Sequence, residues 1–493
     1  MSHFLWRSKL SCRCGWTLNY RVGKKALHDM ICLGNIKSIT KGEIVIPNID
    51  FTTFMLNVSN SDIKKLDIFS VEDTVFYDIT LVRKPMACPY CCGKMIGHGH
   101  KLKLIKHPAV RESNGIIRYN ANRYICKDCR KTALENNPFS FAGFNSSFFL
   151  LRNAMKLLAN LNYTLHMISE ELHISPTQLN MYIDSYITIP RRPLPQCLGI
   201  DELHSKALSK RNSSYLCVLV DNEKSSVYDV LDYRKKTNIA LYFSSFPREE
   251  RCKVKYVKID MWEPYKEVAN TYFPNCIVAV DSFHVVKHLH SDFERLRIDL
   301  MNHCDYGSNA YYLLKKWSWL LITDKVNLDN ERVYNNRFRM KLNRRDIRDM
   351  IFDTFPVLFT AYQLKERYRK MNAECSYDEA VCRYDEIVSA FKHSGIRQYE
   401  EFTSILFAWR EEILNSFLRP FNNRKLSNAF TENVNGKLRT YLSVSKGIGN
   451  FQRFRKHVIY ALNPDVMYGL TSSLSSCKRC QKSVTHITKL KIS

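Results

Sequence analysis

The segment Cys197-Leu198-Gly199-Ile200-Asp201 is an apolar run that ends in a carboxylate, and Glu202 follows it directly. Two further strand-like segments, Val254 to Asp260 and Cys276 to Asp281, also end in a carboxylate. Short apolar runs that are bounded by polar residues predict β-strands. Because the chain as a whole is basic, aspartates at the ends of three predicted strands indicate a shared site at one edge of a sheet.

The segments between these runs predict a mixed α/β fold. Tyr215 to Val220 and Ser226 to Leu231 have the pattern of a β-hairpin, and Thr237 to Ser245 has that of a helix. Pro264 to Tyr272 predicts a second helix, with Pro264 near its start, where proline is tolerated. The resulting order, strand-strand-strand-helix-strand-helix-strand, is that of the ribonuclease-H-like fold.

Converging carboxylates repel one another unless a divalent cation neutralises them. Oxygen ligands suit Mg²⁺ or Mn²⁺, and two such ions can activate a nucleophile and stabilise the leaving oxygen of a phosphodiester. In a ribonuclease-H-like fold the acids come from the first strand, the fourth strand and a C-terminal helix. Counting strands makes these Asp201, Asp260 and Glu432, which we expect to be catalytic metal ligands.

A fourth acid, Asp281, is expected on the fifth strand and begins the motif Asp281-Ser282-Phe283-His284. Asp281 and His284 could orient a substrate phosphate or a metal-bound water. Any single aspartate at a strand end is more often a turn former or a helix cap. The hypothesis of an active site therefore depends on the joint placement of these residues.

Two Cys-x-x-Cys pairs, Cys88/Cys91 and Cys126/Cys129, precede this region. Two residues between thiolates let each turn place both sulfurs on one tetrahedral ion, so the four cysteines predict a structural zinc site on a small β-ribbon. The alternative is four unrelated cysteines. A third pair, Cys477/Cys480, lacks a clear fourth ligand and is a weaker candidate for metal binding.

Residues 163–183 have the pattern of a helix-turn-helix. Ile168 and Leu172 are apolar on the first helix, a short turn follows, and Ser175 can cap a second helix that begins with Pro176. Such a second helix lies in the major groove of DNA. Candidate DNA-binding residues at its start are Ser175, Thr177, Gln178 and Asn180. The alternative is an ordinary helical hairpin.

Composition restricts the class of protein. The 74 Lys and Arg exceed the 48 Asp and Glu, which gives a formal net charge of +26 over 493 residues and favours a polyanionic partner such as nucleic acid. The 16 Gly and 15 Pro are too few for a collagen-like or mostly disordered chain. The apolar runs are too short for a membrane span, no secretory signal is visible, and the 17 Cys therefore suggest metal ligands and core residues rather than disulfides.

These patterns predict an α/β multidomain protein whose catalytic domain is interrupted by an all-α insertion. The insertion is rich in charged residues and aromatics, and its basic block Arg337 to Arg345 could line a path for DNA. The expected divisions are an N-terminal region of unclear role (1–85), a zinc ribbon (86–140), a helix-turn-helix region (141–190), the first part of the catalytic core (191–290), the helical insertion (291–425), the C-terminal helix of the core (426–465) and a basic tail (466–493).

At this level of detail the chain resembles the zinc-ribbon DDE transposases of bacterial insertion sequences, specifically the L-three insertion-sequence family. The resemblance covers roughly residues 40–465. Beyond the cysteine pairs and the helix-turn-helix, it rests on Gly199-Ile200-Asp201-Glu202, Val257 to Tyr265, Phe273-Pro274-Asn275, Val280 to Val286, Ser427 to Lys437 and Gly447 to Phe451.

The resemblance implies a transposase that binds terminal inverted repeats, cleaves DNA with Mg²⁺ or Mn²⁺ and joins the 3′ ends to target DNA. It further implies a homo-oligomer in the bacterial cytoplasm, associated with the nucleoid. Asp201, Asp260 and Glu432 fall on the acidic motif positions, although Asp281 is an alternative to Asp260 for the second one. Two other hypotheses are a catalytically silent, transposase-derived DNA-binding regulator and a nuclease of the same fold.

Overall fold

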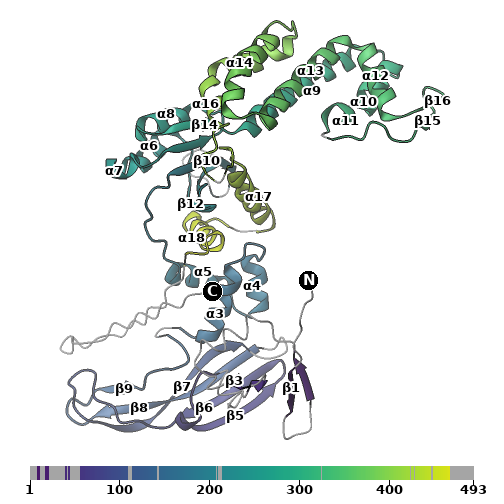
Figure 1. The fold of residues 1–493 in the computed structure, drawn as a ribbon. Helices are drawn as coiled ribbons and strands as arrows, with labels where there is room; N and C mark the ends of the chain where they lie inside the picture. Colours follow the sequence, from purple (N-terminus) through teal and green to yellow (C-terminus); the bar gives the residue numbers. More distant parts are fainter. Residues whose placement is uncertain are drawn as a thin grey trace. The chain divides into compact units, whose positions relative to one another are not determined.

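The computed structural model describes residues 56–466 except 109–113, 142–143, 207, 209–213, 324, 422, 427 and 446–447, together with the backbone of four short strands before residue 56. The described residues form two compact units, one that ends at Asn153 and one that begins at Ala154 (Figure 1). Within the described residues, no helix is both long and apolar enough to cross a membrane.

The first unit is built on a five-stranded sheet. Its strands are β5 (Ile63–Val71), β6 (Thr74–Leu81), β7 (Met95–Pro108), β8 (Asn114–Cys126) and β9 (Thr132–Leu134). The order is β5-β6-β8-β7, with β9 also paired to β8, and only the β6–β8 pair is parallel. The other described elements are η1 (Asn60–Asp62) and two short hairpins, β1 (Ser8–Ser11) with β2 (Thr17–Tyr20) and β3 (Ile39–Thr40) with β4 (Glu43–Ile44).

The expected ribbon between the cysteine pairs is present as the long β7–β8 pair, but it belongs to a larger sheet. Strand β6 lies parallel to β8 and contributes Tyr77, Ile79 and Leu81 to the same core as Ile117 and Tyr119 of β8. Residues before position 85 therefore help to build the sheet on which the cysteines sit. The parallel register is a long-range pairing, which local periodicity does not encode.

The second unit contains a mixed sheet in the order β12-β11-β10-β13-β14. Strands β10 (Cys197–His204), β11 (Tyr215–Asp221) and β12 (Ser226–Leu231) are antiparallel neighbours, whereas β13 (Tyr256–Ile259) and β14 (Ile277–Val280) run parallel to β10. Helices α6 (Lys236–Ser244), α7 (Arg248–Arg251) and α8 (Glu263–Tyr272) connect them. Apart from the extra α7, this is the element order that the sequence predicted.

Strand β10 extends three residues beyond the predicted end at Asp201. Its pairing with β13 stops at Gly199, but its antiparallel pairing with β11 continues to His204. The extension is stabilised by Leu203, which is fully buried and lies opposite Leu216. Asp201 therefore lies within a strand, at the point where the neighbouring parallel strand has ended.

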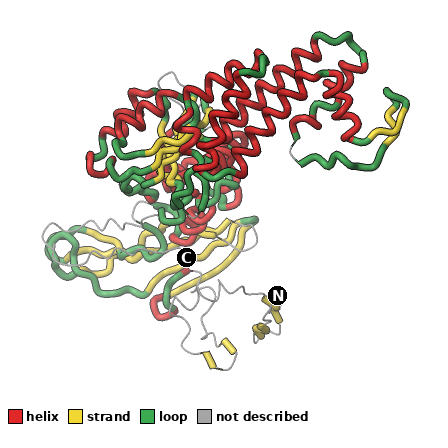
Figure 2. The backbone as a smooth tube through the Cα atoms, turned by 45° about the horizontal axis from the view of Figure 1, so that its top comes forward, coloured by secondary structure: helices red, strands yellow, loops and turns green. Residues whose placement is uncertain are grey.

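Between β14 and the last helices the chain forms the helical insertion (Figure 2). Its elements are α9 (Ser282–Asn302), α10 (Asn309–Lys316), α11 (Trp319–Ile322), β15 (Val333–Asn335), β16 (Met340–Leu342), α12 (Arg344–Thr354), α13 (Pro356–Glu374), α14 (Tyr377–Lys392), η2 (Arg397–Tyr399), α15 (Glu400–Ala408) and α16 (Arg410–Asn415). The prediction of an all-α insertion was wrong at β15 and β16. Each strand has three residues, too few for alternation to be visible in the sequence.

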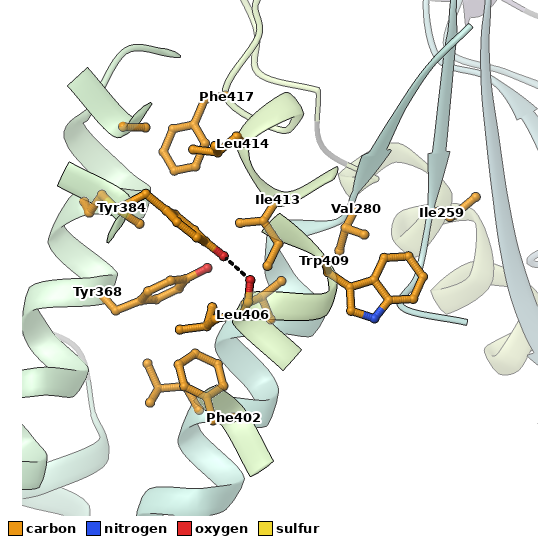
Figure 3. Close-up of a cluster of buried hydrophobic side chains, with 14 of the residues drawn as sticks. Ile259, Val280, Tyr368, Tyr384, Phe402, Leu406, Trp409, Ile413, Leu414 and Phe417 are labelled. Carbon is orange, nitrogen blue, oxygen red and sulfur yellow. Dashed lines mark hydrogen bonds between the residues drawn. The ribbon is translucent and has the colours of Figure 1, made fainter. Parts of the chain in front are cut away.

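The insertion shares one core with the sheet, as Figure 3 shows. Ile259 and Val280 of the sheet belong to the same buried cluster as Tyr368, Phe402 and Trp409 of the insertion. Within it, the hydroxyl of Tyr384 donates a hydrogen bond to the carbonyl of Leu406 (2.8 Å), which satisfies the buried polar atom of the ring. The sheet and the insertion are therefore packed as one body.

The remaining helices are α3 (Phe148–Leu158), α4 (Leu165–Glu171), α5 (Pro176–Tyr186), α17 (Ala429–Val444) and α18 (Phe451–Leu462). Helix α17 packs on β10 and β11, and α18 packs on β12 and α5. The side chain of Arg453 on α18 forms an ion pair with Asp184 on α5 (2.7 Å). Helix α18 thus connects the α4–α5 pair to the sheet.

Candidate functional site

Three candidate side chains from three different elements meet beside the centre of the sheet. Asp201 comes from β10, His284 from the first turn of α9 and Glu432 from the first turn of α17. One donor atom of each lies within 4.8 Å of those of the other two. His284 Nε2 lies 3.5 Å from Glu432 Oε1. We call these three residues the acidic site.

Close packing of α17 on β10 positions the acidic site. Asn435, which is fully buried on α17, donates hydrogen bonds from Nδ2 to Asp201 Oδ2 (2.9 Å) and to the carbonyl oxygen of Glu202 (3.2 Å). Two helical turns earlier, at the N-cap of α17, Asn428 lies so near Gly199 that a Cβ atom there would be 2.8 Å from its Oδ1. Sequence reasoning missed the roles of both asparagines and of Gly199, because the contacts between α17 and β10 join residues more than 200 positions apart.

Asp281 lies at the end of β14 and caps α9. Its Oδ1 accepts a hydrogen bond from the backbone N–H of Phe283 (3.3 Å), and the residue is 98% buried. Its other oxygen, Oδ2, is buried without a hydrogen-bond partner among the described residues. Asp281 also raises the pKa of both Asp201 and Glu432, after the larger effect of burial. It is therefore close enough to these two carboxylates to interact electrostatically.

Asp260 follows β13 and lies outside the group of three atoms that meet within 4.8 Å. Burial, followed by the negative charges of Glu202 and Asp201, raises its pKa to about 7. Its Oδ1 is buried and has no hydrogen-bond partner among the residues that the structure describes. Asp260 thus interacts electrostatically with both carboxylates, and more strongly with Glu202 than with Asp201.

Glu202 is held by an arginine that is itself held by aromatic rings. Arg234 forms an ion pair with Glu202 through Oε2 and stacks over the rings of Tyr215 (4.0 Å) and Trp262 (5.1 Å). Burial nevertheless raises the pKa of Glu202. Its second oxygen, Oε1, has no hydrogen-bond partner among the described residues. The sequence showed Glu202 as part of a carboxylate pair, but nothing in it indicated Arg234 as the partner.

The residues present fit a divalent cation. Asp260, Asp281 and Glu202 each carry a buried oxygen without a hydrogen-bond partner, and such atoms are costly unless a ligand satisfies them. Burial also raises the pKa of Asp201 and Glu432, and a cation bound beside these carboxylates would offset this effect. Carboxylate oxygens suit Mg²⁺ or Mn²⁺.

The four cysteines of the first unit also converge. Cys88 Sγ lies 3.6 Å from Cys129 Sγ, and Cys91 Sγ lies 3.5 Å from Cys126 Sγ. Tetrahedral zinc with Zn–S bonds of about 2.3 Å requires sulfurs about 3.8 Å apart, so the spacing fits this ion. Burial raises the pKa of the Cys88 thiol, but hydrogen bonds from the backbone of Tyr90 and Cys91 outweigh it and lower that pKa to about 7.

The two cysteine turns have the same backbone design. The residue after each second cysteine, Cys92 or Arg130, has a positive φ, of 63° and 57°. In both turns the backbone N–H of the first cysteine donates to the carbonyl five residues later, at Gly93 (2.8 Å) or Lys131 (2.9 Å). Two repeats of one strained turn are consistent with a shared ligand rather than with four unrelated cysteines.

Helices α4 and α5 occupy the positions of the predicted helix-turn-helix. Ser175 caps α5 by accepting a hydrogen bond from Gln178 N (3.2 Å), and Pro176 begins the helix, as the sequence predicted. Ser175 and Thr177 are exposed, whereas Gln178 and Asn180 are partly buried. Gln178 Nε2 also donates to the hydroxyl of Tyr182 (2.9 Å). Cys477 and Cys480 lie outside the described residues.

Comparison with known proteins identifies the class. Residues 198–458, more than half of the chain, match a family model described as a transposase, and this segment contains all the candidate acids. The chain belongs to the ISL3 family of DDE transposases.

The chain is also similar to the transposase for insertion sequence element IS1001 of Bordetella parapertussis, with 24% identity over 226 residues. That alignment covers 46% of this chain and 52% of the relative, so the chain spans about half the length of the curated relative that it matches.

Proposed function

We propose that this chain binds the terminal inverted repeats of an insertion sequence, cleaves DNA at their ends and joins the 3′ ends to target DNA. The main observation behind the proposal is that donor atoms of Asp201, His284 and Glu432 lie within 4.8 Å of one another. These residues come from three elements of the segment that matches the family model. The strand order β12-β11-β10-β13-β14 supports a ribonuclease-H-like core.

The proposed ligands of catalytic metal are Asp201, Asp260 and Glu432, with Asp281 and His284 as accessory residues. When bound, Mg²⁺ or Mn²⁺ would activate a water or a 3′-hydroxyl and stabilise the leaving oxygen of the phosphodiester. Asn435 holds one Asp201 oxygen by its hydrogen bond and so fixes the direction of the other. His284, beside Glu432, can donate a hydrogen bond to a non-bridging phosphate oxygen.

The proposed DNA-binding elements are the α4–α5 pair, through Ser175, Thr177, Gln178 and Asn180, and the cysteine-bearing sheet, with structural zinc held by Cys88, Cys91, Cys126 and Cys129. The exposure of Ser175 and Thr177 at the start of α5 supports a role in reading the repeats. The net charge of +26 supports a large electrostatic share of binding, with steep dependence on salt. We also propose that the protein acts as a homo-oligomer in the bacterial cytoplasm.

The test uses labelled duplexes that carry the element's terminal repeat, a target plasmid and Mg²⁺. The wild type should cleave and join the ends, and Asp201→Asn should abolish both while keeping its affinity for the repeat. A wild type that binds the repeat but never cleaves would identify a regulator. Ends that are cleaved and never joined would identify a nuclease.

A further inference from the structure

The β15–β16 hairpin of the helical insertion is anchored both at its turn and at the end of β16. Leu342 of β16 belongs to the buried cluster that the sheet and the insertion share. Phe338 in the turn packs edge-on against Tyr312, with 5.9 Å between the ring centroids. Arg337 donates from Nε to Asn309 Oδ1 (2.7 Å) and also binds the carbonyl oxygen of Gly307. The hairpin is therefore held in place by packing and by hydrogen bonds.

The two strands of the hairpin expose apolar side chains. Val333, Tyr334 and Met340 are 64%, 56% and 51% exposed, although all three lie within one two-stranded ribbon. Single exposed apolar residues are ordinary, but three on so small an element indicate a contact surface.

The same ribbon carries two basic side chains that no carboxylate neutralises among the described residues. Arg339 and Lys341 are exposed, and neither has an ion-pair partner in that part of the chain. By contrast, Arg332 and Arg345 nearby are paired with Asp346 (3.1 Å) and Asp329 (2.7 Å).

The backbone fixes where these two side chains lie. Arg339 has a φ of 54°, and its N–H donates to the carbonyl of Asn335 (2.8 Å), which closes the turn. Lys341 lies directly opposite Tyr334 in the register. Two exposed cations on an anchored ribbon are complementary to the phosphates of a polyanion.

Helix α9 places the hairpin at a definite distance from the acidic site. The helix carries His284 in its first turn and ends at Asn302, and Gly307, which binds Arg337, follows five residues later. Its 21 residues span about 30 Å at 1.5 Å per residue. Figure 1 shows β15 and β16 at the end of α9 that lies away from β14.

We propose that the β15–β16 hairpin enters the major groove of the duplex that is cleaved at the acidic site, with Arg339 and Lys341 on backbone phosphates. For a duplex that runs along α9, 30 Å at 3.4 Å per base pair places the contact about nine base pairs from the scissile phosphate. A two-stranded ribbon has the width that the major groove admits. This assignment rests on the proposed function, since it needs DNA at the acidic site.

The test compares the full-length wild type with R339A/K341A on terminal-repeat duplexes that extend either 15 or 5 base pairs past the cleavage position on each side. Loss of two phosphate contacts should lower the slope of log affinity against log salt by about 2 on the long duplex. The difference between the two proteins should disappear on the short duplex. The single variant K341A should lower the slope by about 1.

The matched control is R248A/K253A, which removes the same two residue types from exposed positions beside α7. A slope for R339A/K341A equal to that of this control would overturn the assignment and leave the proposed function intact if the wild type still cleaves. A defect confined to joining pre-cleaved ends to plasmid would place the hairpin on target DNA and overturn it too. A wild type that neither binds nor cleaves the repeat would overturn both proposals.

Discussion

Asn435 on α17 and Asp201 on β10 are joined by a buried hydrogen bond of 2.9 Å between Nδ2 and Oδ2. It connects the helix that carries Glu432 to the strand that carries the first acid, across 234 positions of sequence. Asn435 thereby fixes the direction of the Asp201 carboxylate and the distance between this carboxylate and that of Glu432. The residue touches no reacting atom and acts as a positioning residue.

Replacing Asn435 by alanine should lower the cleavage rate by roughly 10–100-fold, the usual cost of losing a residue that orients a metal ligand. Affinity for the terminal repeat should not change, because Asn435 is buried. The measurement is cleavage of a labelled repeat over a range of Mg²⁺ concentrations, and higher Mg²⁺ should restore part of the rate. Thr440→Ala, an exposed change on the same helix, serves as the control. A rate for Asn435→Ala equal to this control would exclude the positioning role.

Replacing Gly199 by alanine should lower the free energy of unfolding by about 1–3 kcal/mol. The new Cβ would lie 2.4 Å from Asn222 Nδ2, 2.6 Å from Val220 Cγ2 and 2.8 Å from Asn428 Oδ1, so these three side chains must move. Gly436→Ala is the matched control, because nothing lies within 4 Å of its Cβ and alanine favours the middle of α17 by about 1 kcal/mol. The midpoint of chemical denaturation should therefore fall for Gly199→Ala and rise for Gly436→Ala.

Replacing Cys129 by serine should remove one zinc ion per chain, since only three sulfurs of the group would remain. Cys92→Ser is the matched control, because Cys92 is adjacent to the group but not part of it. Elemental analysis of the purified proteins gives the zinc content, and proteolysis of the first unit reports its stability. Equal zinc in the two variants would show that the four cysteines do not hold the ion together.

How far the sequence specifies this molecule depends on whether a signal is local. The strand that contains Asp201 and the strands that lead into Asp260 and Asp281 were predictable, because each is a short strand-like segment next to a carboxylate. The cap at Ser175 was predictable for the same reason. The contacts of Asn435 with Asp201 and of Gly199 with Asn428 were not, because they depend on how elements pack. The β15–β16 hairpin was missed because its strands are only three residues long.

Acidification should destabilise each unit through one buried histidine. Burial lowers the pKa of His107 in the first unit and of His457 in the second to about 4, whereas an unfolded histidine titrates near 6.5. Between these values the unfolded chain binds more protons than the folded one, so the free energy of unfolding falls as the pH drops from 6.5 to 4. The contribution is fully present above pH 6.5 and amounts to about 3 kcal/mol for each histidine.

Replacing His457 by glutamine should remove that part of the pH dependence from the second unit only. His457 makes hydrogen bonds to the carbonyl of Leu158 (2.9 Å) and to the hydroxyl of Tyr441 (3.1 Å), and an amide can make both without titrating. Hydrogen exchange at pH 7 and pH 4.5, followed separately for peptides of each unit, measures the effect. His107→Gln is the reciprocal control, and an unchanged slope in the variant's own unit would refute the assignment.

The two candidates for the second catalytic acid can be separated by their different surroundings. Asp260→Asn should lower cleavage by about 1000-fold or more, because a metal ligand contributes several kcal/mol and each tenfold in rate corresponds to about 1.4 kcal/mol. Asp281→Asn should have a smaller effect of about 10–100-fold, since asparagine caps a helix as well as aspartate does and α9 keeps its place. Both variants should bind the repeat normally. If the order of the two rates is reversed, Asp281 is the second acid and Asp260, beside Glu202, is the accessory one.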